Sequence, residues 1–198
     1  SLLFLIGTTC GILTNLHLHP DERRLDALLR QADEQMRTAL RALAEGADAR
    51  NPLILLGETL RQADECAAKN AENSLTDAPT REIHYINMRR QQRRILLQVT
   101  KDAQKVQGHP PQEAEVRALI GRIFAEYDRE NDCTSLLFAL HDLLAEMQRQ
   151  PLPATRGEFE DRALLYVLLR RMEDFLLLKR EFYEAYGFEN SQQLEYES

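Results

Sequence analysis

The chain has 198 residues, of which 43% are hydrophobic and 29% charged, with a formal net charge of −7; this length suits one domain or one domain with an appendage, and the hydrophobic share is too high for a disordered chain. Leucine occurs 33 times, against 12 for valine and isoleucine together, and because unbranched side chains favour helices this composition predicts an all-α protein without a sizeable sheet. Three cysteines exclude a disulfide scaffold, and the acidic balance argues against nucleic acid as a partner.

The first twenty residues carry no acid, lysine or arginine. A helix of residues 2–16, LLFLIGTTCGILTNL, would reach roughly 22 Å, which is shorter than the ~30 Å hydrocarbon core of a bilayer. Three interpretations are open. The segment is a secretory signal peptide, a buried core helix, or the cytosolic end of a transmembrane helix. A signal peptide would be expected to have a basic segment and an A-x-A cleavage site, and this segment has neither.

Two features of this segment favour the membrane interpretation. Gly7 and Gly11 form a G-x-x-x-G pair, which suits close packing of membrane helices. A basic flank typical of the cytosolic side follows, with His17, His19, Arg23 and Arg24. We therefore predict residues 1–19 to be the truncated end of a transmembrane helix.

Six amphipathic segments follow in chain order, with apolar residues at the i, i+3, i+4, i+7 spacing of a helix. We expect helices at about residues 21–46, 53 or 56 to 73, 80–107, 112–129, 136–147 and 156–186. A break at residues 131–132 leaves open whether the fourth and fifth are separate or one kinked helix. Because short turns force neighbours to run antiparallel, we predict an elongated antiparallel bundle of five to six helices over residues 20–187. Residues 188–198 should form an acidic tail.

Local signals mark where some of these helices begin and end. Gly46 and Asn51–Pro52 are expected to end the first helix, and Thr155 with Glu158 forms a capping box that starts the sixth. The sixth helix is expected to have broad apolar sides, marked by Phe159, Ala163, Tyr166, Val167, Arg170, Phe175, Leu178, Phe182 and Tyr186.

The sequence contains no pattern typical of catalysis, metal binding or cofactor binding. The glycines are scattered and form no G-x-x-x-x-G-K or G-x-G-x-x-G phosphate loop, and no cysteine has a C-x-x-C partner. His141 lies among apolar residues of its helix, which favours a structural role over phosphotransfer. We therefore predict that the protein is not an enzyme and has no catalytic residues, no metal site and no cofactor.

The middle of the third helix is unusually basic, with seven arginines and lysines against two acids in residues 81–105. Arg89/Arg93 and Arg90/Arg94 are i,i+4 pairs, and such like-charge pairs destabilise an isolated helix by roughly a few tenths of a kcal/mol each. Two interpretations are open. Either acids of a neighbouring helix, or solvent, neutralise these arginines, or they form an anion site for lipid headgroups or a carboxylate ligand.

Three stretches, in order along nearly the whole chain, resemble bacterial aromatic acid exporter–type proteins. The opening IGTTCGILTNLHLHP is similar to the end of the last membrane helix of that family. HYINMRRQQRRILLQV resembles its cytosolic helix, with matches at Tyr85, Met88, Arg89 and Gln92. LPATRGEFEDRALLYVLLRRMEDFLLLKREFY resembles its final helix, with matches at Pro153, Thr155, Glu158, Phe159, Glu160, Arg162, Ala163, Glu173, Phe175, Leu176 and Lys179.

The resemblance implies a cytosolic helical domain of an inner-membrane exporter of aromatic or related organic acids, with an accessory or regulatory role in assembly or substrate sensing. It implies three partners: the protein's own membrane domain, further copies in a homo-oligomer, and an aromatic carboxylate ligand. A membrane-anchored sensory or signalling bundle is the alternative.

The resemblance and the basic middle of the third helix together indicate a set of candidate residues. The candidates for ligand binding or interaction are Tyr85, Arg89, Gln92, Arg93, Glu160, Arg162 and Glu173. For Glu160, Arg162 and Glu173, inter-helix salt bridges are favoured over ligand contacts.

Overall fold

The computed structural model describes residues 20–73 and 80–187. Six helices make up most of these ranges: α2 (Pro20–Ala44), α3 (Arg50–Asn73), α4 (Thr80–Ala103), α5 (Pro111–Glu126), α6 (Thr134–Arg149) and α7 (Arg156–Tyr186). No strand occurs in the two ranges, and the predicted all-α class is confirmed. The predicted membrane segment with Gly7 and Gly11 and the predicted acidic tail lie outside the described residues.

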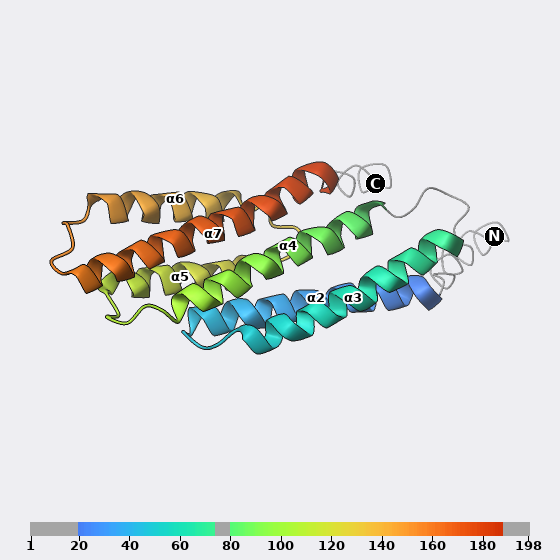
Figure 1. The fold of residues 1–198 in the computed structure, drawn as a ribbon. Coiled ribbons are helices and arrows are strands. Elements are labelled where there is room, and N and C mark those ends of the chain that lie inside the picture. The colour runs from blue at the N-terminus through green and yellow to red at the C-terminus, as the bar shows by residue number, and fades with distance from the viewer. Residues whose placement is uncertain (1–19, 74–79, 188–198) are drawn as a thin grey trace, which may run out of the picture.

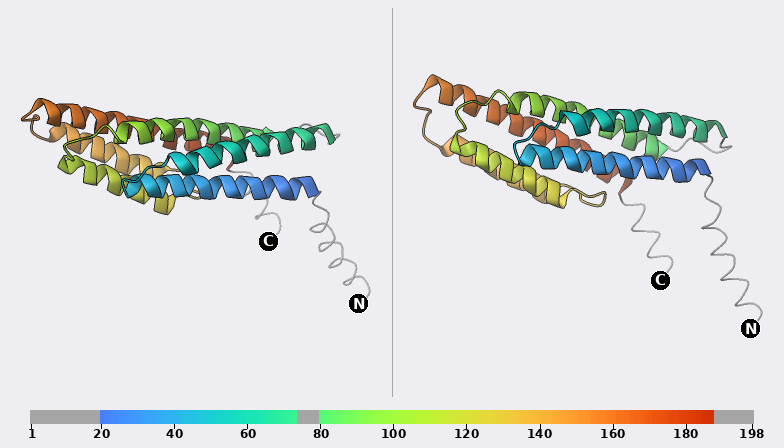
Figure 2. Two further views of the ribbon diagram at one scale, coloured as in Figure 1. Left: turned by 60° about the horizontal axis from the view of Figure 1, so that its bottom comes forward. Right: turned by 90° about the horizontal axis from the view of Figure 1, so that it is seen from below.

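The helices form an elongated bundle in which successive helices run in opposite directions (Figure 1), as short connections require. α2 pairs with α3, and α4 lies along α7. α5 packs against α2, while α6 packs against α7. α2 begins and α7 ends toward the same end of the bundle, and the α2–α3 and α4–α5 connections lie at the other end (Figures 1 and 2).

The core is built largely from leucine and alanine. The predicted stripe of α2, from Leu25 to Leu43, is buried, and each fully buried leucine contributes roughly 1.5–3 kcal/mol. Ala63 and Ala67 of α3 are also buried, and small side chains of this kind let neighbouring helices approach closely. Among the helices of the described ranges, none combines the length and apolar character that crossing a bilayer requires.

The α2–α3 connection agrees with prediction at its start but not at its end. Gly46 follows α2 as expected, with a φ of +72° that suits glycine. α3 begins at Arg50, so the Asn51–Pro52 pair lies in its first turn, and the prediction that this pair precedes the helix is wrong. Proline is tolerated there because first-turn amides have no partner within the helix.

The α4–α5 connection is longer than expected, because α4 ends at Ala103 and not near Gln107. The carboxylate of Asp161 on α7 accepts hydrogen bonds from the backbone amides of Gln107 at 3.0 Å and Gly108 at 2.7 Å. These bonds hold the chain in a loop and replace the helical ones. α5 and α6 are separate helices, which settles the question left open by the sequence.

α7 starts at the predicted capping box, where the Glu158 amide donates to Thr155 Oγ1 at 3.1 Å. Its apolar residues divide between two faces. The buried face runs from Leu165 to Leu176. Of the residues expected to mark the apolar sides, the following five are exposed: Phe159, Ala163, Tyr166, Val167 and Arg170.

Candidate functional site

Arg89 of α4 is the largest fully buried side chain among the described residues, with 1% of its surface exposed. Its guanidinium lies against two tyrosine rings, 4.8 Å from the centroid of Tyr85 and 5.0 Å from that of Tyr127. Its Nε and Nη2 donate to Asp33 of α2 at 3.0 and 2.7 Å. The carboxylate and the ring faces together offset the cost of removing the guanidinium from water.

Hydroxyl and amide oxygens complete the surroundings of Arg89. The Tyr85 hydroxyl donates to Asp33 and accepts from Arg89 Nε at 3.1 Å and Nη2 at 2.6 Å. Arg89 Nη1 donates to the Tyr127 hydroxyl and to Gln92 Oε1, the latter at 2.8 Å. The Tyr127 hydroxyl donates to the same Gln92 oxygen at 2.7 Å. We call Asp33, Tyr85, Arg89, Gln92 and Tyr127 the arginine cluster.

Two contacts extend the arginine cluster to α7 and to the α5–α6 connection. Gln92 Nε2 donates to the backbone carbonyl of Phe175 at 2.8 Å. Arg129, which is exposed, donates from Nε to the second carboxylate oxygen of Asp33 at 2.7 Å. One set of hydrogen bonds therefore joins side chains of α2 and α4 to the backbone of α7 and to the chain on the C-terminal side of α5.

Lys179 of α7 is a second buried cation beside the arginine cluster, with 3% of its surface exposed. Its Nζ donates to the Asn131 carbonyl and lies 5.3 Å from the centroid of the Tyr127 ring. Burial lowers the pKa of Lys179, and the charge of Arg89 lowers it further. Burial raises the pKa of the Cys133 thiol, which interacts electrostatically with Lys179.

The charged and phenolic groups of the arginine cluster shift one another's pKa values. Burial alone would raise the pKa of Asp33, but Arg89, the hydrogen bond from Tyr85 and Arg129 outweigh burial and hold that pKa below its usual value. Burial raises the pKa of Tyr85 to about 12 and also raises that of Tyr127. Burial disfavours charge on Arg89, but the oxygens of Tyr127, Tyr85 and Asp33 raise its pKa. At neutral pH the cluster therefore holds one carboxylate, one guanidinium and two neutral phenols.

This arrangement is suited to holding helices together. All three nitrogens of the Arg89 guanidinium already donate to oxygens, and both oxygens of Asp33 accept from cations. A carboxylate ligand would have to displace Asp33 to reach Arg89. Within residues 20–73 and 80–187, no group of three or more His, Cys, Asp or Glu side chains is placed to hold a metal ion.

The structure brings the predicted residues Tyr85, Arg89 and Gln92 together, but it places Arg93 against α3. Arg93 Nε donates to the Leu53 carbonyl at 2.6 Å. The neighbouring arginine of the basic segment pairs with an acid of α3, at 3.0 Å between Arg90 and Asp64. Of the four stacked arginines, Arg89 thus meets an acid on α2 and Arg90 meets one on α3. This agrees with the interpretation that acids of neighbouring helices neutralise the basic segment.

Glu160 and Arg162 form ion pairs inside α7. Glu160 pairs with Arg156 at 2.8 Å, and Arg162 pairs with Glu158 at 2.6 Å. Each partner lies four residues earlier, and this spacing places both side chains on the same helix face. The expected inter-helix salt bridges are therefore wrong for these two residues.

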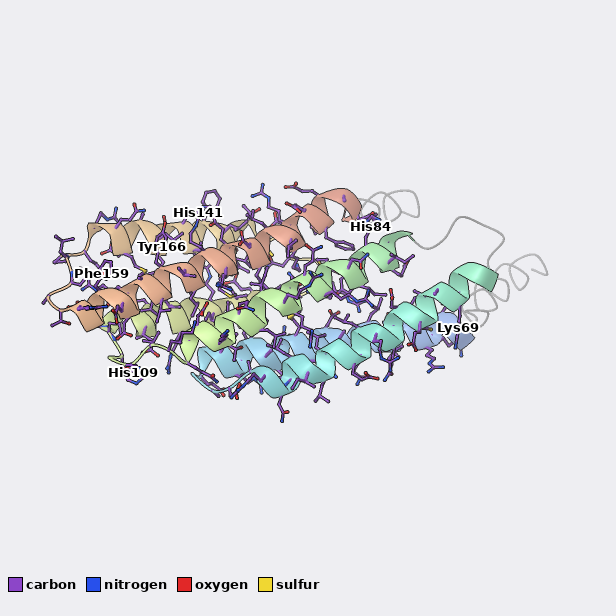
Figure 3. The ribbon with its side chains drawn as sticks, viewed as in Figure 1. Lys69, His84, His109, His141, Phe159 and Tyr166 are labelled. Carbon is purple, nitrogen blue, oxygen red and sulfur yellow. The ribbon has the colours of Figure 1, made fainter. Side chains whose placement is uncertain are left out.

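Glu173 does contact a neighbouring helix. Its carboxylate, 12% exposed, lies 2.7 Å from His141 Nε2 of α6 and 2.5 Å from Arg170 Nη1 of α7. Figure 3 shows His141 on α6. This contact joins α6 to α7 at the surface of the bundle.

Sequence reasoning missed Asp33, the only carboxylate of the arginine cluster. Asp33 follows Ala32 and lies four residues after Leu29, at the edge of the buried stripe of α2. An acid beside an apolar stripe is seldom shielded from water unless it is paired. That position was the signal that could have identified it.

A cavity of about 230 Å³ lies near the α2–α3 and α4–α5 connections. Its wall includes apolar residues of several elements: Leu43, Val106, Val116, Ile120, Leu165 and Leu168. Arg117 of α5, part of the same wall, is ion-paired with Glu113. The cavity therefore combines an apolar wall with the cation of Arg117 and with two carboxylates, those of Asp48 and Glu113.

The described residues thus form an all-α helical bundle with a core rich in leucine and alanine and a buried ion pair between Arg89 and Asp33. The family described as "Putative aromatic acid exporter C-terminal domain" matches residues 16–180. The chain therefore belongs to this family of C-terminal domains.

Two individual proteins are similar to this chain. "Uncharacterized protein YqjA" of Bacillus subtilis (strain 168) is 25% identical over 193 residues, which cover 91% of this chain and 58% of that protein. The chain thus spans little more than half the length of that relative. A crystal structure from Clostridium difficile 630, described as a "putative membrane protein", has a TM-score of 0.71 at 22% identity and covers 82% of this chain and 98% of that one. That likeness shows a shared fold.

Proposed function

We propose that the chain is the cytosolic accessory domain of an inner-membrane exporter of aromatic or related organic acids, and that it acts in assembly of the exporter. Membership in an exporter-domain family favours this role over that of a signalling bundle. The uncharged residues 1–19 directly precede α2 and are followed by basic residues, as on the cytosolic side of a membrane helix.

The observation that carries the assembly role is the arginine cluster. Arg89 is 1% exposed and its donors are taken by protein oxygens. A site of this kind fixes the relative positions of helices and leaves no group ready for chemistry on a substrate. A rigid bundle with a defined shape is suited to packing against other protein parts.

Export measured with the whole gene tests this role. Cells that express it are loaded with benzoate or a hydroxybenzoate, and efflux is compared with that of cells expressing a version truncated before Pro20. We expect the truncated version to insert in the membrane but to lose most export. Unchanged export would contradict an accessory role. A fluorescent-protein fusion after Ser198 checks orientation, because it fluoresces in the cytoplasm and not in the periplasm.

The 230 Å³ cavity favours a second role, sensing of the exported acid. Its apolar wall suits an aromatic ring, and Arg117 is the cation that a carboxylate would meet. Because Arg117 is paired with Glu113, a ligand would compete with that carboxylate.

Calorimetry of the chain with benzoate tests sensing. We expect binding in the millimolar range or tighter, and its loss in Arg117→Gln. Arg122→Gln is the matched control, because Arg122 also pairs with a glutamate four residues away on α5 but does not line the cavity. Absence of binding, or equal binding by both variants, would contradict sensing at this cavity.

A further inference from the structure

α7 has an outer, solvent-exposed face with a regular pattern. Its residues recur at alternating spacings of four and three: Arg156, Glu160, Ala163, Val167, Arg170, Asp174 and Leu177. This is the 3.5-residue period of a seam between two long helices. Phe159 and Tyr166 flank the seam, with 62% and 39% of their surface exposed (Figure 3). Large apolar side chains that recur on an exposed helix face indicate a contact surface.

We propose that this outer face of α7 binds the same face of a second copy of the chain, with the two α7 helices antiparallel. The inference deepens the assembly role proposed above and rests on it. A two-fold axis at the level of Leu165 makes the interface isologous, so each contact occurs twice.

The charges of the outer face are complementary to themselves in this arrangement. With the axis at Leu165, Arg156 lies opposite Asp174 of the partner subunit, nine residues from the axis on each side. Glu160 lies opposite Arg170 of the partner subunit, five residues from the axis. Four opposite-charge contacts therefore border the interface, and such contacts fix the register of two helices.

The middle of the seam is apolar. Ala163 lies opposite Val167 of the partner subunit, and the small alanine side chain lets the helices approach closely. Tyr166 is one residue from the axis, so the two copies of this ring meet beside the seam. An apolar, aromatic centre with a charged rim is the usual composition of a protein interface.

A parallel pairing of the same faces is disfavoured. It would place each residue opposite its own copy, so that Glu160 would face glutamate and Arg170 would face arginine. Like charges across an interface cost binding free energy. The antiparallel arrangement puts the two Pro20 ends at opposite ends of the dimer, so two copies attached to one membrane would lie with their long axes along its surface.

Sedimentation equilibrium of the 198-residue chain, with charge reversals on the outer face, tests the proposal. We expect the wild type to dimerise in the micromolar range. Glu160→Arg and Arg170→Glu each place two like-charge contacts in the interface, and each should raise the Kd by about tenfold or more. The double variant Glu160→Arg/Arg170→Glu restores opposite charges only in the antiparallel arrangement, and its Kd should return to within about threefold of the wild type.

Arg122→Glu is the control, because it reverses a charge in an exposed i,i+4 pair of α5 outside this face; its Kd should equal that of the wild type. Far-UV circular dichroism verifies that every variant is folded. A monomeric wild type, single reversals without effect, or a double variant weaker than either single would each overturn the proposal. Because this measurement needs neither membrane nor transport, its failure is distinct from failure of the export experiment.

Discussion

Replacing Asp33 by alanine should destabilise the bundle by about 3 kcal/mol, the lower end of the range for removing one partner of a buried ion pair. The substitution leaves the guanidinium of Arg89, 1% exposed, without a carboxylate. The lower end applies because the Asp33 side chain is 20% exposed and because neutral oxygens of Tyr127 and Gln92 still accept from Arg89. Urea unfolding at pH 7 followed by circular dichroism should show a midpoint lowered by about 1.5 M, with a slope of about 2 kcal/mol/M.

A double-mutant cycle identifies the cause of that loss. Asp33→Ala combined with Arg89→Met should cost less than the sum of the two single changes, by about 2 kcal/mol, because no unpaired buried charge remains. Arg61→Ala, which removes two exposed ion pairs of α3, with Glu58 and Glu65, is the control and should cost less than about 1 kcal/mol. The reasoning is refuted if Asp33→Ala stays within about 1 kcal/mol of the wild type or if the two costs add.

Acid should weaken the bundle through Asp33, whose pKa in the folded state lies below the usual 3.8. The Asp33 carboxylate therefore stabilises the bundle fully above pH 3.8, and this stabilisation is lost as the pH falls through the folded-state pKa. The urea midpoint of the wild type should therefore fall more steeply below pH ~4 than that of Asp33→Asn, and parallel curves would contradict this. Lys179 should shift stability in the same direction but at higher pH, because its lowered folded-state pKa penalises folding until the pH approaches 10.5. The wild type should therefore gain stability relative to Lys179→Met as the pH rises toward that value, and a constant difference would argue against it. Asp161→Asn should cost about 1–3 kcal/mol, since an amide cannot accept with both atoms. Hydrogen exchange at the amides of Gln107 and Gly108 should accelerate, and unchanged exchange there would be the contrary result.

The helices could be predicted because their core residues follow a strict helical period. The stripe of α2 from Leu25 to Leu43 is leucine, alanine and methionine at regular spacing, and all of it is buried. The buried face of α7 was harder to predict, because apolar residues occupy both faces of this helix. Periodicity alone does not distinguish the face that packs inside the bundle, around Phe175, from the one that carries Phe159 and Tyr166 at the surface.

Only the part of the candidate site that lies on α4 could be predicted from the sequence. Tyr85, Arg89 and Gln92 lie three or four residues apart on α4, so one helix face identifies them. Asp33 lies 56 residues before Arg89 on another helix, and no local pattern pairs an acid of α2 with a particular arginine of α4. Such a pairing depends on how the helices are oriented around the core.

Export by the whole protein, with the domain present but its buried ion pair broken, tests the central claim most directly. Asp33→Ala and the control Arg61→Ala are introduced into the complete gene, and efflux of benzoate or a hydroxybenzoate is measured at equal amounts of protein in the membrane. The account predicts that export falls in Asp33→Ala and is unchanged in Arg61→Ala. Full export in Asp33→Ala, with faster protease digestion showing that the bundle is destabilised, would contradict the claim that this helical domain supports the exporter.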